Sequence, residues 1–132
     1  MVLVILLVLA LFVLQTLLPE RFRPRGGGGG ARIAEALGPR DDPPPQSRMG
    51  ARATRALANM HEALPVFLAL ALLNLITHTA GAMAVMGGWV FLVARVLYVP
   101  AYLSGIPGVR TLLWIGGWVG LVMMLIPLLA LV

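Results

Sequence analysis

The segment ALANMHEALPVFLALALLNLIT, residues 56–77, is apolar and long enough to cross a lipid bilayer as one helix. A bilayer core of about 30 Å needs about 20 helical residues. Residues 1–18, 82–102 and 112–132 have the same character. Hydrophobic residues make up 60% of the 132-residue chain and charged residues only 11%, which is unlike a soluble globular domain. We therefore predict an all-α integral membrane protein, a four-transmembrane-helix bundle formed by a single domain over residues 1–132.

The first apolar segment is slightly short for a membrane span and begins at Met1. A signal peptide is the alternative interpretation, but the segment lacks a basic start and an A-x-A-like cleavage site. We expect it to be retained as a transmembrane helix.

The basic residues are concentrated in one polar stretch. All ten basic residues are Arg, and eight of them lie in residues 19–55, between the first and second apolar segments. Because basic residues accumulate in cytoplasmic loops, we predict that this stretch is a cytoplasmic loop and that both termini lie outside. The Arg residues favour anionic membrane lipid as a partner. They are not interleaved with aromatic residues, so we expect no nucleic-acid binding.

The middle of this stretch is rich in Gly and Pro. The Gly run at residues 26–30 and the Pro run at residues 43–45 cannot continue a helix. We expect a mobile linker with a short helical turn at residues 31–37. The Gly run is not followed by the Gly-Lys-Ser/Thr of a phosphate-binding loop.

Four polar residues enter the second apolar segment at spacings of three, four and three. On a helix, Arg52, Arg55, Asn59 and Glu62 would share an arc of about 80°. An ionised side chain near the bilayer centre costs about 2.5–3.5 kcal/mol even on the insertion scale. This stripe therefore predicts a polar ligand or partner.

A second polar stripe lies on the third apolar segment. Arg95, Tyr98 and Tyr102 would share an arc of about 60°. Glu62 and Arg95 each lie about 9–10 Å from the cytoplasmic ends of their helices, so antiparallel packing would bring them to a similar depth. We predict one pocket that contains four Arg, one Glu, one Asn and two Tyr: Arg52, Arg55, Arg95, Arg110, Glu62, Asn59, Tyr98 and Tyr102.

The chemistry of this pocket suits a small anionic ligand that carries one cationic group. Guanidinium groups bind carboxylates in a bidentate manner, and Glu62 could receive an ammonium group. Structural alternatives stay open. Glu62 and Arg95 could simply neutralise each other, the Arg residues near helix ends could snorkel to the interface, and the Tyr residues could form an aromatic belt. No metal-ligand spacing joins His61 to His78, so we expect no metal.

Two motifs resemble a known family. The stretch RATRALANMHEALPVF, residues 52–67, is similar to the second-helix motif of the MAPEG family, the membrane-associated proteins in eicosanoid and glutathione metabolism. The stretch RVLYVPAYLSGIPGVRT, residues 95–111, resembles that family's third helix and the turn after it. The chain looks like a bacterial-type member, which implies a homotrimer in the bacterial inner (plasma) membrane, with glutathione bound between subunits near the cytoplasmic face.

The resemblance also implies roles for residues. Arg110 matches the arginine that stabilises the glutathione thiolate, and is the expected catalytic residue. The expected glutathione-binding residues are Arg52, Arg55, Asn59, Glu62, Arg95, Tyr98, Tyr102 and Thr111. Two departures occur: some members have His in place of Tyr98, and the step from Glu62 to Pro65 is one residue shorter than in the mammalian enzymes. Arg21 and Arg23 are candidates for the family's basic residue at the end of the first helix.

The expected function is that of a glutathione-dependent transferase or peroxidase that activates the thiol for attack on a lipophilic electrophile. Glutathione would be the cosubstrate, and the partners would be further copies of the chain, membrane lipid and a lipophilic small molecule. A non-catalytic scaffold or thiol-binding protein with the same trimeric fold is the alternative. A small transporter is a weaker one, because the fourth segment has no ionisable residue and the chain has no inverted repeat.

Overall fold

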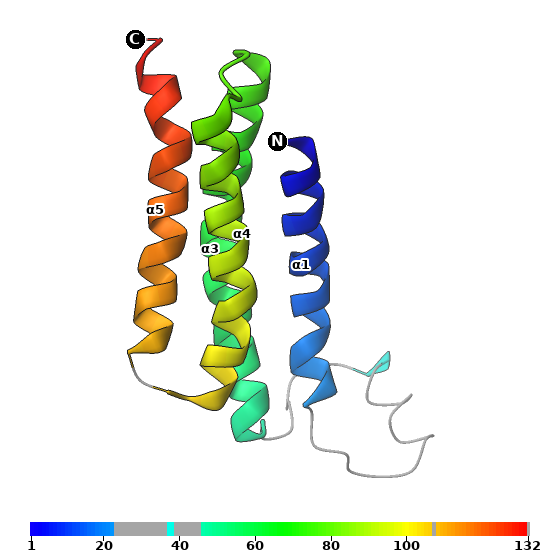
Figure 1. The fold of residues 1–132 in the computed structure, drawn as a ribbon. Helices are drawn as coiled ribbons and strands as arrows, with labels where there is room; N and C mark the ends of the chain where they lie inside the picture. Colours follow the sequence, from blue (N-terminus) through cyan, green and yellow to red (C-terminus); the bar gives the residue numbers. More distant parts are fainter. Residues whose placement is uncertain (23–36, 39–45, 107, 132) are drawn as a thin grey trace.

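The computed structural model describes residues 1–22, 37–38, 46–106 and 108–131, and these form a bundle of long helices (Figure 1). The bundle consists of α1 (Val2–Arg21), α3 (Arg48–Ile76), α4 (Ala82–Ser104) and α5 (Val109–Leu129). Each of these helices is long and apolar enough to cross a membrane. The predicted all-α bundle with four candidate membrane helices is confirmed. The expected linker and most of the helical turn at residues 31–37 lie outside the described residues.

Helix bounds differ from those of the apolar segments. The loop predicted at residues 19–55 is helical up to Arg21 and again from Arg48, so α3 begins eight residues before the apolar segment at residue 56. Hydropathy marks the part of a helix suited to lipid, whereas backbone hydrogen bonding continues into the polar flank. The Ser47 hydroxyl starts α3 by accepting a hydrogen bond from the Gly50 amide at 3.0 Å. Helix α5 is displaced from the segment at residues 112–132, to Val109–Leu129.

The helices are arranged with α4 near the centre of the contacts. Helix α4 packs most extensively on α5, while α1 packs on α3 and α4. Both chain ends and the α3–α4 turn lie at one end of the bundle (Figure 1). We call the other end the loop end; it contains the end of α1, the start of α3 and the connection from α4 to α5.

Two glycines allow α4 and α5 to approach at backbone distance. A Cβ atom on Gly120 would lie 2.6 Å from the carbonyl oxygen of Gly87, and one on Gly87 would lie 2.6 Å from that of Gly120. Small residues at such positions let membrane helices pack closely. By contrast, a Cβ on Gly116 would be 3.7 Å from Ala94, an ordinary contact. Gly120, and not Gly116, therefore makes the tight packing contact with α4.

The apolar core is built around two stacked aromatic rings. Phe67 of α3 and Phe91 of α4 have centroids 4.7 Å apart and planes inclined by 10°. Val4 and Val8 extend this core to α1, and Met124 extends it to α5. The core thus joins all four helices.

A buried amide fastens the end of the bundle opposite the loop end. Asn74 is 0% exposed, and its Nδ2 donates to the carbonyl oxygens of Leu70 and Met124. Its Oδ1 accepts from the Thr79 hydroxyl at 3.0 Å. Asn74 therefore joins α3, α5 and the α3–α4 turn through bonds that satisfy a polar side chain in an apolar surrounding.

A hydroxyl fastens the loop end. The Ser47 hydroxyl donates to the carbonyl oxygen of Phe22 at 2.7 Å while it caps α3. The C-terminal end of α1 and the N-terminal end of α3 are therefore linked directly.

Candidate functional site

The centre of the site is a hydrogen bond between α3 and α4. Arg95 of α4 is only 3% exposed, and its Nη1 donates to Oδ1 of Asn59 on α3. Gly117 of α5 lies against the guanidinium, and a Cβ there would be at an ordinary contact distance of 3.5 Å from Nε. Nε itself is buried and has no hydrogen-bond partner among the described residues. Among the described residues the buried guanidinium thus donates to the Asn59 amide, and its Nε–H is a buried donor without a partner.

Glu62 shares a small pocket with this pair, as the depth argument predicted. The pocket has a volume of about 70 Å³ and is lined by Asn59, Glu62, Ala63, Arg95, Trp114 and Trp118. Glu62 is exposed, and within the described part of the chain it forms no ion pair with Arg95. The alternative of mutual neutralisation is therefore not what the structure shows: Arg95 bonds to the neutral amide, and the carboxylate stays accessible.

Aromatic rings flank Arg95 along α4, and the series continues through Tyr98 and Tyr102 to Arg110 towards the loop end. The Cζ atom of Arg95 lies 5.1 Å from the centroid of Phe91 and 5.7 Å from that of Tyr98. The rings of Tyr98 and Tyr102 follow at 5.4 Å, and the Cζ of Arg110 lies 5.0 Å from the Tyr102 ring. All three cation–ring distances are within the range of cation–π attraction. We call Asn59, Glu62, Arg95, Tyr98, Tyr102 and Arg110 the polar column.

Arg52 has a different partner from the rest of its stripe. Its Nη1 donates to the main-chain carbonyl oxygen of Leu103 at 2.7 Å. That carbonyl lies in the last turn of α4, where helix carbonyls lack partners within the helix. Arg52 therefore closes the end of α4, and its predicted role as a glutathione ligand stays a prediction.

The remaining predicted residues lie at the surface of the described chain. Arg55, Arg110 and Thr111 are all exposed. The volume enclosed beside Glu62, about 70 Å³, is well below the roughly 300 Å³ at which small-molecule pockets begin. The described residues bring together the two predicted stripes, and the pocket that they form beside Glu62 is smaller than a ligand-sized cavity.

Sequence reasoning missed several polar and amphipathic residues. Gln15 and Asn74 are buried single amides within apolar helices. Each could have been noticed because polar side chains inside membrane spans are costly and are often functional. Trp114 and Trp118, which line the small pocket, carry no spacing signal that separates them from ordinary interface tryptophans.

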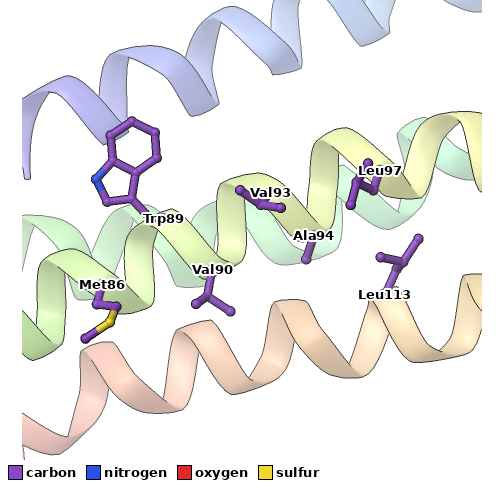
Figure 2. A pocket seen from close by; sticks show the side chains of 7 residues that line it. All are labelled: Met86, Trp89, Val90, Val93, Ala94, Leu97 and Leu113. Carbon is purple, nitrogen blue, oxygen red and sulfur yellow. The ribbon is translucent and has the colours of Figure 1, made fainter.

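An apolar groove follows the contact of α4 with α5 (Figure 2). It has a volume of about 380 Å³ and is lined by Met86, Trp89, Val90, Val93, Ala94, Leu97 and Leu113. No polar side chain contributes to it, so it suits hydrocarbon and adds no reacting group to the polar column.

The comparison with protein families matches almost the whole chain. The model of the MAPEG family covers residues 1–130. The chain belongs to the MAPEG family. No curated protein and no solved structure gives a significant match. Together with the four apolar helices, MAPEG membership makes this an integral membrane protein. The resemblance of residues 52–67 and 95–111 to MAPEG motifs is thereby confirmed at the level of the family.

Proposed function

We propose that this MAPEG protein is a membrane-embedded glutathione transferase or peroxidase that activates the glutathione thiol for attack on a lipophilic electrophile. The observation that carries the proposal is the polar column, which leads from the buried Arg95–Asn59 bond to the exposed Arg110 over Tyr102. This column presents two arginines, Arg95 and Arg110, and one carboxylate that forms no ion pair among the described residues, along three helices that are mostly apolar.

The ligand chemistry follows from the charges. Glutathione has two carboxylates, one ammonium group and one thiol. Arg55 and Arg95 offer guanidinium donors to carboxylates, and Glu62 offers an acceptor to the ammonium group. A cation beside the thiol favours the thiolate and lowers the pKa of the thiol. In the proposed reaction Arg110 holds this thiolate, whose sulfur forms a bond to the electrophilic carbon while the leaving group departs with the bonding electrons.

The surface position of several of these residues supports a site completed by another copy of the chain. Glu62, Arg55 and Arg110 are exposed on the single chain, and the pocket of about 70 Å³ beside Glu62 is too small to contain a tripeptide. We therefore propose a homotrimer with glutathione between neighbouring subunits. Arg21 and Arg48 lie at the loop end, which supports placing this end in the cytoplasm and both termini outside. For a bacterial-type member the membrane would be the plasma membrane.

The direct test is ultraviolet absorbance of the thiolate when glutathione is added to the purified protein near neutral pH. We expect a thiolate band for the natural protein and for the Arg48→Ala variant, whose arginine lies at the start of α3. We expect no band and no conjugating activity for Arg110→Ala, with the same oligomer mass by native mass spectrometry. Full conjugating activity of Arg110→Ala would overturn the assignment.

A non-catalytic thiol-binding or scaffold protein is the second candidate. It is favoured by the structural use of Arg52, which closes α4, and of Arg95, which bonds Asn59. In that case glutathione would bind without a thiolate band, or would not bind, while the oligomer formed normally.

A further inference from the structure

The position of Arg110 depends on the last turn of α4. Arg110 is the second residue of α5, and a short connection joins it to the end of α4 at Ser104. The Cζ atom of Arg110 lies 5.0 Å from the ring centroid of Tyr102, which belongs to that last turn. A cation–ring contact holds only while the cation stays within about 6 Å of the ring. If the last turn of α4 opened, the Tyr102 ring would therefore move away from Arg110.

Main-chain hydrogen bonds do not close this turn. The last carbonyl groups of a helix lack partners within the helix and need donors from outside it. Gly105 follows α4 in the left-handed conformation, and in the described part of this connection neither Gly105 nor Ile106 donates a main-chain hydrogen bond to the helix. The next residue in the sequence, Pro107, has no N–H to donate. The closure of α4 therefore depends on side chains.

Arg52 closes the turn from α3. Its Nη1 donates to the carbonyl oxygen of Leu103 at 2.7 Å. The same guanidinium lies against Gly105, because a Cβ on Gly105 would be only 2.5–2.8 Å from its Cζ and both of its Nη atoms. The half-buried Arg52 side chain is thus engaged with the end of α4 by a bond and by close packing.

The helix that carries Arg52 is itself anchored at this end. The Ser47 hydroxyl caps α3 and donates to the carbonyl oxygen of Phe22, directly after α1. The end of α1, the start of α3 and the connection from α4 to α5 lie together at the loop end (Figure 1). A series of contacts therefore leads from α1 through α3 and Arg52 to Tyr102 and Arg110.

We propose that Arg52 is a positioning residue that fixes the last turn of α4 and thereby holds the Arg110 guanidinium where the glutathione thiolate forms. This inference rests on the proposed function, in which Arg110 stabilises the thiolate. A misplacement of about 1 Å can cost about a hundredfold in rate. Loss of Arg52 should therefore impair formation of the thiolate, while Arg55 and Arg95 still bind the carboxylates of glutathione.

The first measurement needs no ligand. Amide hydrogen exchange of residues 101–106 is followed by mass spectrometry in the natural protein, in Arg52→Met and in Arg48→Met. Arg48 is the exposed first residue of α3 and serves as the matched control. Because a hydrogen bond from a charged donor changes an equilibrium about tenfold or more, exchange should be about tenfold faster in Arg52→Met and unchanged in Arg48→Met. Arg52→Lys should restore slow exchange, because an ammonium group can also donate to the Leu103 carbonyl.

The second measurement follows the thiolate absorbance of bound glutathione against pH. In Arg52→Met the midpoint should move towards that of Arg110→Ala, and kcat should fall about tenfold or more, with the KM for glutathione changed less than about twofold. Arg52→Lys should recover most of the loss. Added to Arg110→Ala, the Arg52→Met substitution should not move the midpoint further, because it acts through Arg110.

Failure of this inference and failure of the proposed function give different results. If the natural protein forms no thiolate band with glutathione, both are overturned. If the band forms but its midpoint is the same in Arg52→Met, only the positioning role of Arg52 is overturned. Unchanged exchange of residues 101–106 in Arg52→Met would overturn that role as well. A raised KM for glutathione with an unchanged midpoint would instead make Arg52 a direct ligand.

Discussion

The Nη1 atom of Arg52 lies 2.7 Å from the carbonyl oxygen of Leu103, so a guanidinium of α3 closes the last turn of α4. The next turn is made by Gly105, which has a φ of 73° in the left-handed region. A Cβ atom on Gly105 would lie 2.5 Å from the Nη2 of Arg52. Arg52 and Gly105 together form the C-terminal cap of α4, where the chain turns towards Arg110.

Substitution of Gly105 by Ala should destabilise the protein. The left-handed conformation alone costs a residue with a Cβ about 1–2 kcal/mol, and the guanidinium would also have to move. We expect a clear fall in the midpoint of thermal unfolding in detergent. Gly81→Ala is the control, because φ there is −72° and the nearest atom to a Cβ is 3.9 Å away.

A double-mutant cycle with Arg52→Met separates the two causes. Without the guanidinium, Gly105→Ala should be less costly than in the natural protein, and the difference measures the coupling of the two positions. If Gly105→Ala lowers the stability equally in both backgrounds, Arg52 does not contribute to the cost of the substitution.

Loss of the Asn59 amide should weaken the packing of α3 on α4 and lower the stability of the protein. In Asn59→Leu, the buried guanidinium of Arg95 loses its hydrogen bond, and such bonds to charged groups contribute about 1.5–3 kcal/mol. Adding Arg95→Met removes the stranded charge and should recover part of the unfolding temperature. Neither Asn59→Leu nor the double variant should bind glutathione in isothermal titration, because both lack the Asn59 amide. An Asn59→Leu protein as stable as the natural one would contradict the importance of this bond.

The two glycines on α5 should respond differently to a methyl group. Gly120→Ala forces apart the backbones of α4 and α5, because its Cβ would meet the Gly87 carbonyl and the Phe91 amide. Overpacking of this kind typically costs about 1–3 kcal/mol. Gly116→Ala places its Cβ at an ordinary contact distance from Ala94 and should leave thermal unfolding nearly unchanged. Equal shifts for the two variants would mean that the helices separate easily here.

Removal of Arg110 should change the pH at which bound glutathione ionises. A free thiol of this type has a pKa of about 8.5, and a nearby cation lowers the pKa because it favours the thiolate. The midpoint of the thiolate absorbance should therefore lie below this value in the natural protein and move to higher pH in Arg110→Ala. Arg48→Ala should titrate as the natural protein does. An unchanged midpoint in Arg110→Ala would assign thiol activation to another group.

The apolar segments were sufficient to predict the bundle, and helical spacing was sufficient to predict that Asn59, Glu62 and Arg95 meet. These inferences depend only on periodicity and depth. The partner of Arg52 was not predictable, because the Leu103 carbonyl becomes available only through the turn at Gly105. The role of Asn74 was not predictable for a related reason. Its partner on α5 is the main-chain carbonyl of Met124, and a main-chain carbonyl leaves no mark in the sequence because every residue has one.

Trp114 and Trp118 were missed because the rotation of α5 about its own axis, and not their spacing, decides that they face the small pocket. Their centroids lie 5.9 Å apart with planes inclined by 67°. Many arrangements of α5 about its own axis would be compatible with its uniformly apolar sequence. The close contact of Gly120 with Gly87 selects one of them.

The Ser47 hydroxyl donates a hydrogen bond to the carbonyl oxygen of Phe22. The two residues that flank the connection between α1 and α3 therefore hold its ends together. The sequence predicts a flexible linker between these residues, and doubling the length of such a linker costs only about 0.6 kcal/mol of closure free energy. The bundle should therefore tolerate a shortened, lengthened or foreign insert between these two anchors. A fluorescent reporter or a crystallisation chaperone is best spliced there.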